Sequence, residues 1–173
     1  LRSVNALYNK GIMNNGSHLI DLFNDFFDTL IIFSVGRPTY DFFEDDPSIP
    51  FVLTGPNNLS INVNCGHASD YDLFEIQFVF SLGIITMELG GLSWRERNVT
   101  NDMVFSGYKI LTKGKTYDGK NFQTLNNAVN NIYNSVNKKA KLKSTGETAY
   151  LAQKLCEKIK KKSLIDSKRK NNE

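Results

Sequence analysis

The chain has few of the residues that build metal centres and disulfide frameworks. Its 173 residues include two cysteines, Cys65 and Cys156, and two histidines, His18 and His67. The cysteines lie far apart and in no metal-ligand spacing, and a structural zinc site takes four Cys or His ligands. We therefore expect no metal site, and two unpaired thiols fit a reducing cytoplasm.

Long apolar runs are also missing. The longest, Leu30–Val35, has the length of a strand, whereas a membrane span needs about 20 apolar residues. The first residues lack the basic, apolar and small-residue pattern of a secretory signal. We therefore predict a cytoplasmic protein that makes no membrane contact. Because the chain begins at Leu1 and not at Met, we expect it to be a trimmed or truncated product.

Basic residues are scarce until the C-terminal end of the chain. Residues 1–137 carry 9 Lys and Arg against 14 Asp and Glu, whereas residues 138–173 carry 12 against 4. The basic end is mostly Lys, and Arg169 is its one residue suited to bidentate contacts with bases. We therefore predict no nucleic-acid partner, and we expect residues 163–173 to form a disordered basic tail.

The remaining composition is that of an ordinary globular domain. Hydrophobic residues make up 40% of the chain and charged residues 23%, which argues against disorder and against fibrous repeats. A chain of this length buries enough surface to fold without disulfide or metal cross-links. We expect a single domain over residues 1–162.

Three helical patterns bracket a middle rich in strands. Over residues 17–28 the apolar side chains fall on one side of a helix, and a second helix is expected to open at Asn121. Its apolar stripe is formed by Leu125, Ala128, Val129, Ile132, Tyr133 and Val136. Ser144 and Glu147 have the spacing of a capping box, which predicts a third helix after them.

The middle of the chain, residues 29–98, has the alternation of half-buried strands. Leu59–Cys65 is the clearest case, with apolar side chains at every second position. The links between successive strands are short, which predicts antiparallel pairing. Along the chain, one helical pattern is followed by strand alternation and then by two more helical patterns. This order predicts an α+β fold: an open, mostly antiparallel β-sheet of about five to seven strands, with the three helices packed on one face. The other face is then free to pack against a second copy.

One cluster of polar residues has the spacing of a site. Asn14, His18 and Asp21 follow one another at i, i+4 and i+7, which places them on one side of a helix that begins early enough. Histidine exchanges a proton near neutral pH and is a common general acid or base. The alternative is that these residues are simply the solvated face of an amphipathic helix.

Two segments resemble the C-terminal domain of the Gfo/Idh/MocA family of sugar and polyol dehydrogenases. Residues 10–22, KGIMNNGSHLIDL, are similar to the segment that opens the first helix of that domain. Residues 125–149, which end in STGETA, are similar to its closing helix pair. The motifs are loose one by one, and their order and spacing over residues 8–162 carry the resemblance.

The resemblance implies roles for several residues of the first segment. His18 matches the acid/base histidine of the family, and Asn14, Asn15, Ser17 and Asp21 would contact substrate. Many family members have Asp at the position of Asn14, and an Asn there cannot take up a proton. This difference points toward a nucleotide-linked or modified sugar as substrate.

The resemblance also implies partners that this sequence does not contain. The family binds NAD or NADP on an N-terminal Rossmann domain with a Gly-rich fingerprint and a catalytic lysine, and neither occurs here. We therefore expect no cofactor on this chain alone and no turnover without that domain. The resemblance further implies a homo-oligomer formed through the sheet face. The alternative function is a non-catalytic binding or assembly module that shares the fold.

Overall fold

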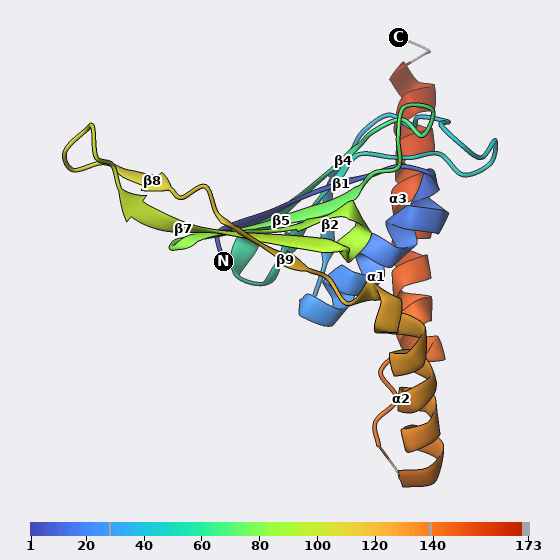
Figure 1. Cartoon of the computed structure of the whole chain (residues 1–173). Helices are drawn as coiled ribbons and strands as arrows, with labels where there is room; N and C mark the ends of the chain where they lie inside the picture. Colours follow the sequence, from blue (N-terminus) through green and yellow to red (C-terminus); the bar gives the residue numbers. More distant parts are fainter. Residues whose placement is uncertain (28, 139, 171–173) are drawn as a thin grey trace.

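A single sheet and three helices make up the molecule (Figure 1). The computed structural model describes residues 1–27, 29–138 and 140–170. The strands are β1 (Ser3–Tyr8), β2 (Ile31–Val35), β3 (Phe51–Gly55), β4 (Leu59–Cys65), β5 (Phe74–Phe80), β6 (Gly83–Glu88), β7 (Ser93–Asn101), β8 (Lys109–Leu111) and β9 (Lys115–Asp118). The helices are α1 (Gly16–Phe26), α2 (Thr124–Lys138) and α3 (Gly146–Lys170).

The sheet is open and almost entirely antiparallel. Its order is β2-β3-β4-β1-β5-β6-β7-β8, and β9 also pairs with β7. The pair β1–β4 is parallel, and every other pair is antiparallel. The predicted α+β class is confirmed. The expected five to seven strands were too few, because β1, β8 and β9 carry no strong period-two pattern of their own.

The core lies between the sheet and two of the helices. Strand β1 alternates buried Val4, Ala6 and Tyr8 with more exposed neighbours. Helix α1 buries Leu19, Ile20 and Phe23 against this face of the sheet, as its apolar pattern predicts. Helix α3 packs against α1. The side chains that α3 contributes to the core are Ala152, Cys156 and Ile159.

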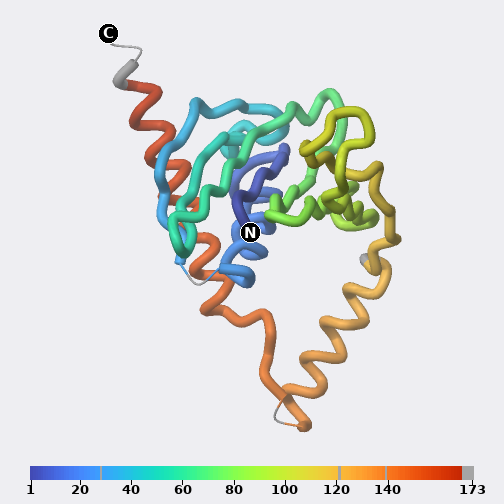
Figure 2. Tube along the Cα trace, turned by 90° about the vertical axis from the view of Figure 1, so that its left-hand side faces the viewer, coloured from blue at the N-terminus to red at the C-terminus, as the bar shows by residue number. Residues whose placement is uncertain are grey.

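Helix α2 does not join this core, so the expectation of three helices on one face is wrong for it. Figure 2 shows α2 running away from the sheet, with the chain returning along a separate path to α3. No residue of α2 is buried. The apolar stripe was predicted correctly as a pattern, but nothing in the described part of the chain covers it. We call the sheet with α1 and α3 the body. Among the described residues no helix is long and apolar enough to cross a membrane.

Two details of α3 differ from the sequence-based expectation. Thr145 caps the helix, since its Oγ1 accepts a hydrogen bond from the Thr148 N–H at 3.2 Å and Thr148 Oγ1 accepts one from the Thr145 N–H at 3.0 Å. The capping box therefore begins one residue after Ser144. The expected disordered tail is helical up to Lys170. Its first residue, Ser163, is buried and donates a hydrogen bond to the Gly36 carbonyl at 2.6 Å. Residues 171–173 lie outside the described part.

The face of the sheet opposite the helices is mostly polar. Register places Asn62 beside Asn5 and Asn5 beside Gln77, and Thr86 and Arg95 continue this row across β6 and β7. The amide of Asn5 donates to Gln77 Oε1 at 3.5 Å. On β5 this open face carries Glu75 and Gln77 as well as Val79.

Candidate functional site

The candidate site is built where β1 ends and α1 begins. Lys10 and Gly11 have positive φ angles of 65° and 91°, and they turn the chain sharply from the strand into a π-helical turn, Gly11–Asn15, that leads into α1. A Cβ atom on Gly11 would overlap the carboxylate of Asp46. Only glycine suits both this backbone angle and this close contact.

The carboxylate of Asp46 holds the start of this helical segment. It accepts hydrogen bonds from the N–H of Met13 at 3.0 and 3.1 Å and from the N–H of Asn14 at 3.1 Å. Asp46 is only 8% exposed. Its charge is stabilised by these donors and by the positive end of the helix dipole. The polar side of α1 is therefore fixed in position from its first turn.

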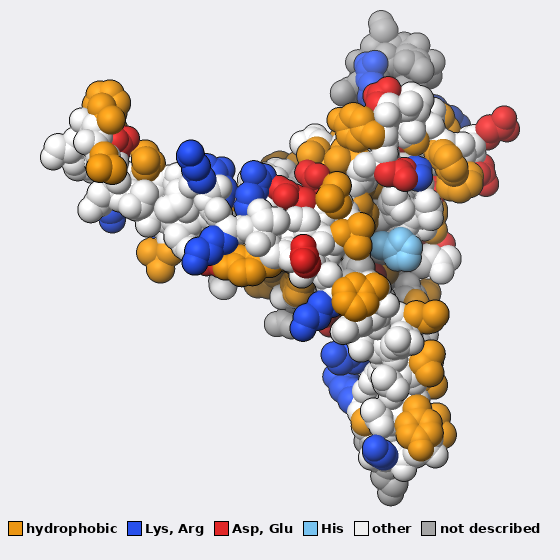
Figure 3. All heavy atoms as spheres, in the orientation of Figure 1, with side chains coloured by type: hydrophobic (Ala, Val, Ile, Leu, Met, Phe, Trp, Pro, Cys, Tyr) orange, Lys and Arg blue, Asp and Glu red, His pale blue; other side chains and the backbone are white. Residues whose placement is uncertain are grey.

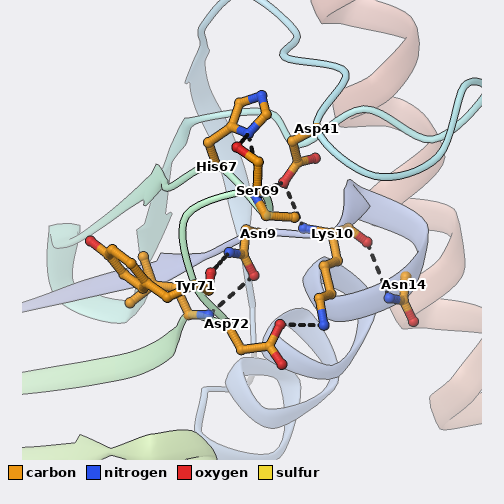
Figure 4. A network of polar contacts seen from close by, with 10 residues as sticks. Asn9, Lys10, Asn14, Asp41, His67, Ser69, Tyr71 and Asp72 are labelled. Atoms are coloured by element: carbon orange, nitrogen blue, oxygen red, sulfur yellow. Dashed lines mark hydrogen bonds and ion pairs between the residues drawn. The ribbon is translucent and has the colours of Figure 1, made fainter.

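A polar network holds two loops, the one around Asp41 and the one before β5, at the C-terminal end of β1 (Figure 4). Asp41 accepts hydrogen bonds from the N–H of Lys10 at 2.9 Å and of Ala68 at 3.2 Å. Asn9 donates to the Tyr71 carbonyl at 2.6 Å and accepts from the Leu73 N–H at 3.1 Å. The ammonium group of Lys10 pairs with Asp72. These contacts order the segments on either side of the site.

His18 and Asp21 lie side by side in the site, as the sequence predicts. Both are exposed, and both line two neighbouring clefts. Ser17 lines the smaller cleft, about 310 Å³ between α1 and α3, and its Oγ donates to the Asn14 carbonyl at 2.6 Å. Among the described residues His18 makes no hydrogen bond to Asn14 or Asp21.

Asn14 and Asn15 do not share this position. The side-chain amide of Asn14 donates to the Lys10 carbonyl at 3.1 Å and is turned back along its own helix, as Figure 4 shows. Neither asparagine is among the residues that line the two clefts. The spacing i, i+4 holds, but the local hydrogen bond points the Asn14 amide away from His18.

The larger cleft, of about 620 Å³, has an apolar floor and a polar rim. It lies beside α1 on the helix-facing side of the sheet, where β6 and β7 are left open by the departure of α2. The floor consists of Leu22, Phe74, Met87, Trp94 and Leu151. The rim carries His18, Asp21, Asn24, Asp25, Thr124, Lys143, Ser144 and Thr148. Asn24 Nδ2 is buried and has no hydrogen-bond partner among the described residues.

This lining suits a ligand with both apolar and hydroxyl surfaces. Aromatic floors bind flat apolar faces, and a few polar groups at the rim fix orientation. Carboxylates such as Asp21 and Asp25 accept hydrogen bonds from hydroxyl groups. His18 is placed to exchange a proton with a group held on this rim.

The sequence did not identify the floor of the larger cleft. Phe74 and Trp94 belong to strands β5 and β7, which are distant from α1 in sequence and meet it only in the fold. Trp94 is the single tryptophan of the chain. Its rarity and its place at the start of a strand, after Gly90 and Gly91, were the available signals.

The two thiols and the buried tyrosine are not chemical groups of the site. Burial raises the pKa of the Cys65 thiol and of the Cys156 thiol to about 12. Burial also raises the pKa of Tyr8, whose hydroxyl donates to the Ile49 carbonyl at 2.9 Å. These groups stay protonated at neutral pH and act as core side chains.

The described residues do not fit a nicotinamide cofactor. A dinucleotide site requires consecutive parallel strands joined by helices, with a Gly-rich turn at the first crossover. Here β1–β4 is the one parallel pair among the described strands, and the Gly-rich fingerprint does not occur in the sequence. The described residues therefore lack the Rossmann-type site that such a cofactor requires.

The fold matches about half of several solved structures. Gal80p of Saccharomyces cerevisiae, a super-repressor mutant, matches with a TM-score of 0.66 and 11% identity over 95% of this chain and 56% of that chain. An NAD-binding protein from Listeria innocua gives 0.64 and 14% over 95% and 57%. UDP-N-acetylglucosamine 3-dehydrogenase GnnA from Acidithiobacillus ferrooxidans gives 0.62 and 9% over 91% and 53%.

At this level of identity the likeness shows the fold alone. No protein-family model matches the chain, and no curated protein matches it. The chain spans a little more than half the length of each of the three structures. The chain therefore shares its fold with about half of each of these three proteins.

Proposed function

We propose that the chain is the substrate-binding and oligomerisation domain of a nicotinamide-dependent oxidoreductase that acts on a sugar, a polyol or a nucleotide-linked sugar. The observation that carries the proposal is the position of His18 and Asp21 together on the rim of a cleft with an aromatic floor. Dehydrogenase and NAD-binding proteins that share the fold support it.

Each part of the cleft has a role in this proposal. Trp94 and Phe74 hold the apolar face of the sugar ring, while Asp21 and Asp25 accept hydrogen bonds from its hydroxyl groups. His18 takes a proton from the reacting hydroxyl or returns one to the carbonyl. Asn14 holds the turn that presents His18 by its bond to the Lys10 carbonyl. NAD or NADP would be bound by a Rossmann domain. That domain is the second partner proposed for this chain, besides the substrate.

Ligand binding by the chain itself tests the proposal. His18 and His67 are the two histidines, so His67, which bonds only to its own loop through Ser69, is an internal control in the same NMR spectrum. Titration with myo-inositol, glucose or UDP-N-acetylglucosamine should shift the ring resonances of His18 and leave those of His67 in place. Equal shifts of both, or none with any of the three compounds, would contradict the proposal.

The alternative is a non-catalytic binding or assembly module. Gal80p, a repressor, shares the fold, and a fold by itself does not require catalysis. His18→Ala distinguishes the two functions in the protein that carries the Rossmann domain. A catalytic His18 predicts that kcat falls by roughly 10²- to 10⁴-fold, whereas a binding module has no turnover to lose.

Association through the open face of the sheet remains part of the proposal. The row of Asn62, Asn5, Gln77, Thr86 and Arg95 means that such an interface would rest on polar contacts across the two sheets. Crosslinking through a cysteine placed at Gln77, compared with one placed at the exposed loop residue Ser69, would test this interface directly.

A further inference from the structure

The apolar stripe of α2 is a surface that the described part of the chain leaves uncovered. We define the stripe as Phe122 in the turn before the helix together with Leu125, Val129, Ile132, Tyr133 and Val136. Their side chains are between 55% and 77% exposed. Figure 3 shows apolar side chains following one edge of the downward projection that α2 forms. Isolated helices of this length are marginal in water, so a surface of this kind needs a partner.

The chain itself contacts the opposite side of α2. Asn131 Nδ2 donates to the Lys141 carbonyl at 3.1 Å, and its Oδ1 accepts from the Lys143 N–H at 2.9 Å. At 100° per residue, Asn131 lies on the far side of the helix from Val129 and Val136. The returning segment is therefore tied to the polar side of α2, and the stripe faces away from it.

The spacing of the stripe fits a second helix. Phe122, Leu125, Val129, Ile132 and Val136 are separated by 3, 4, 3 and 4 positions. This is the a/d repeat of a helix-to-helix seam, with Phe122 and the two Val residues at the a positions and Leu and Ile at the d positions. A surface that packs on a sheet or a loop does not require so regular a seam.

We propose that α2 pairs with α2 of a second copy of this chain, antiparallel and about a two-fold axis. The stripe exposes roughly 700 Å² if each side chain offers the usual area, close to the roughly 800 Å² per partner of a standard interface. Lys138 is the one charged residue in α2, so two copies do not repel along the seam. Antiparallel pairing also opposes the two helix dipoles and keeps the two Lys138 side chains at opposite ends.

Val129→Asp tests the pairing against a matched control, Asn127→Asp, which adds the same charge to the polar side of the same helix. Sedimentation at micromolar concentrations should give the same assembly, a dimer or a larger oligomer, for the wild-type chain and for Asn127→Asp. Val129→Asp should weaken the dimer by about 100-fold or more, because an unpaired charge would be buried in the seam. Circular dichroism should show that the body of both variants stays folded, since α2 contributes no buried residue.

Disulfide trapping tests the direction of the pair. In the antiparallel seam Val129 of one copy lies beside Ile132 of the other, so a mixture of Val129→Cys and Ile132→Cys chains should form a mixed disulfide more readily than either variant alone. Asn127→Cys should form none. The pKa of both native thiols is raised to about 12, so they stay protonated and should not compete.

Three outcomes would overturn the proposal. One is a wild-type chain that stays monomeric at tens of micromolar with α2 helical, in which case a domain outside this chain covers the stripe. Another is a wild-type assembly whose size does not change in Val129→Asp, because the copies would then associate only through another surface, such as the open face of the sheet. The third is trapping of Asn127→Cys chains in preference to the mixed pair.

Discussion

Similar apolar sequences are buried in one region of this molecule and exposed in another. The first region is the body, and the second consists of two projections, α2 and an arm. In the body, Leu19, Ile20 and Phe23 of α1 are completely buried. In α2, Leu125 and Val136 occupy equally regular positions and are 75% and 77% exposed. The other projection is the arm, residues 99–111 around β8, where Met103 is 99% exposed. Both projections extend from the body in Figure 1.

The apolar pattern of an amphipathic helix therefore specifies which face of the helix is apolar. It does not specify what covers that face. The stripe of α1 lies beside β1 in sequence and closes on it through the short turn at Gly11. The stripe of α2 follows strand β9 through the 3-10 turn Asn121–Gln123, and Asn131 fixes the polar side of α2 toward the returning chain. The same amphipathic pattern therefore fills the core in one case and forms a surface in the other.

The largest expected contrast is between two identical substitutions in the two regions. Leu19→Ala should lower the free energy of unfolding by about 2–5 kcal/mol, since it leaves a cavity in the core. Leu125→Ala should change it by less than about 0.5 kcal/mol in dilute solution, because the side chain is mostly exposed. Urea denaturation of both variants measures the contrast. Equal losses would mean that α2 is packed in solution and that the comparison fails.

Two glycines with positive φ give a smaller contrast. Gly11→Ala should destabilise the body by about 1–3 kcal/mol, because strained backbone and overlap with Asp46 act together. Gly107, with φ of 84° in the arm, has nothing within 4 Å of an added Cβ. Gly107→Ala should therefore cost only the backbone preference, about 1 kcal/mol or less. Thermal melts of the two variants, compared with wild type, check the order.

The thiols of the body should differ from a thiol placed on α2. Cys65 and Cys156 should resist a thiol reagent at pH 8 in the native protein and react after unfolding, whereas Asn127→Cys, on the exposed polar side of α2, should react at once. Their folded pKa of about 12 exceeds the unfolded value near 9. Stability from the protonated thiols is therefore complete below pH 9 and is lost as the pH rises toward 12. Cys156→Ala should flatten this dependence, and an unchanged slope would contradict it.

The smallest expected effect on stability belongs to the site. His18 is exposed, so His18→Ala should change the free energy of unfolding by less than about 0.5 kcal/mol. The same variant should lose the ligand-induced NMR shifts proposed above, when followed through neighbouring resonances such as the Trp94 indole. A loss of stability as large as that of Leu19→Ala would make His18 a structural residue.

The sequence predicted the parts of the fold whose signal is local. Strand β4 was expected over Leu59–Cys65 and has those bounds, because its alternation is uninterrupted. Strand β1 was missed because its alternation is short and is interrupted by Leu7, an apolar residue between the buried Ala6 and Tyr8. The capping box was misplaced by one position because Ser144, Thr145 and Thr148 are all capable caps.

The site was predicted in part for the same reason. His18 and Asp21 share one side of a helix, and helical spacing was enough to bring them together. The orientation of Asn14 depends on a hydrogen bond to the Lys10 carbonyl that follows from the π-helical turn. The floor around Trp94 depends on strand order and on the path of α2. Neither can be predicted from a local sequence pattern.

The central position of β1 has a consequence for how the chain is made. Ser3 pairs with Ser60 on one side and with Val79 on the other, so β1 leaves the ribosome long before either neighbour exists. Its apolar side chains must wait in an unpaired strand until β4 and β5 have been synthesised, and such segments are exposed to aggregation. The two halves of the sheet therefore depend on β1 to fold together. The pairing of β1 with both β4 and β5 cannot be complete before residue 80 has been synthesised.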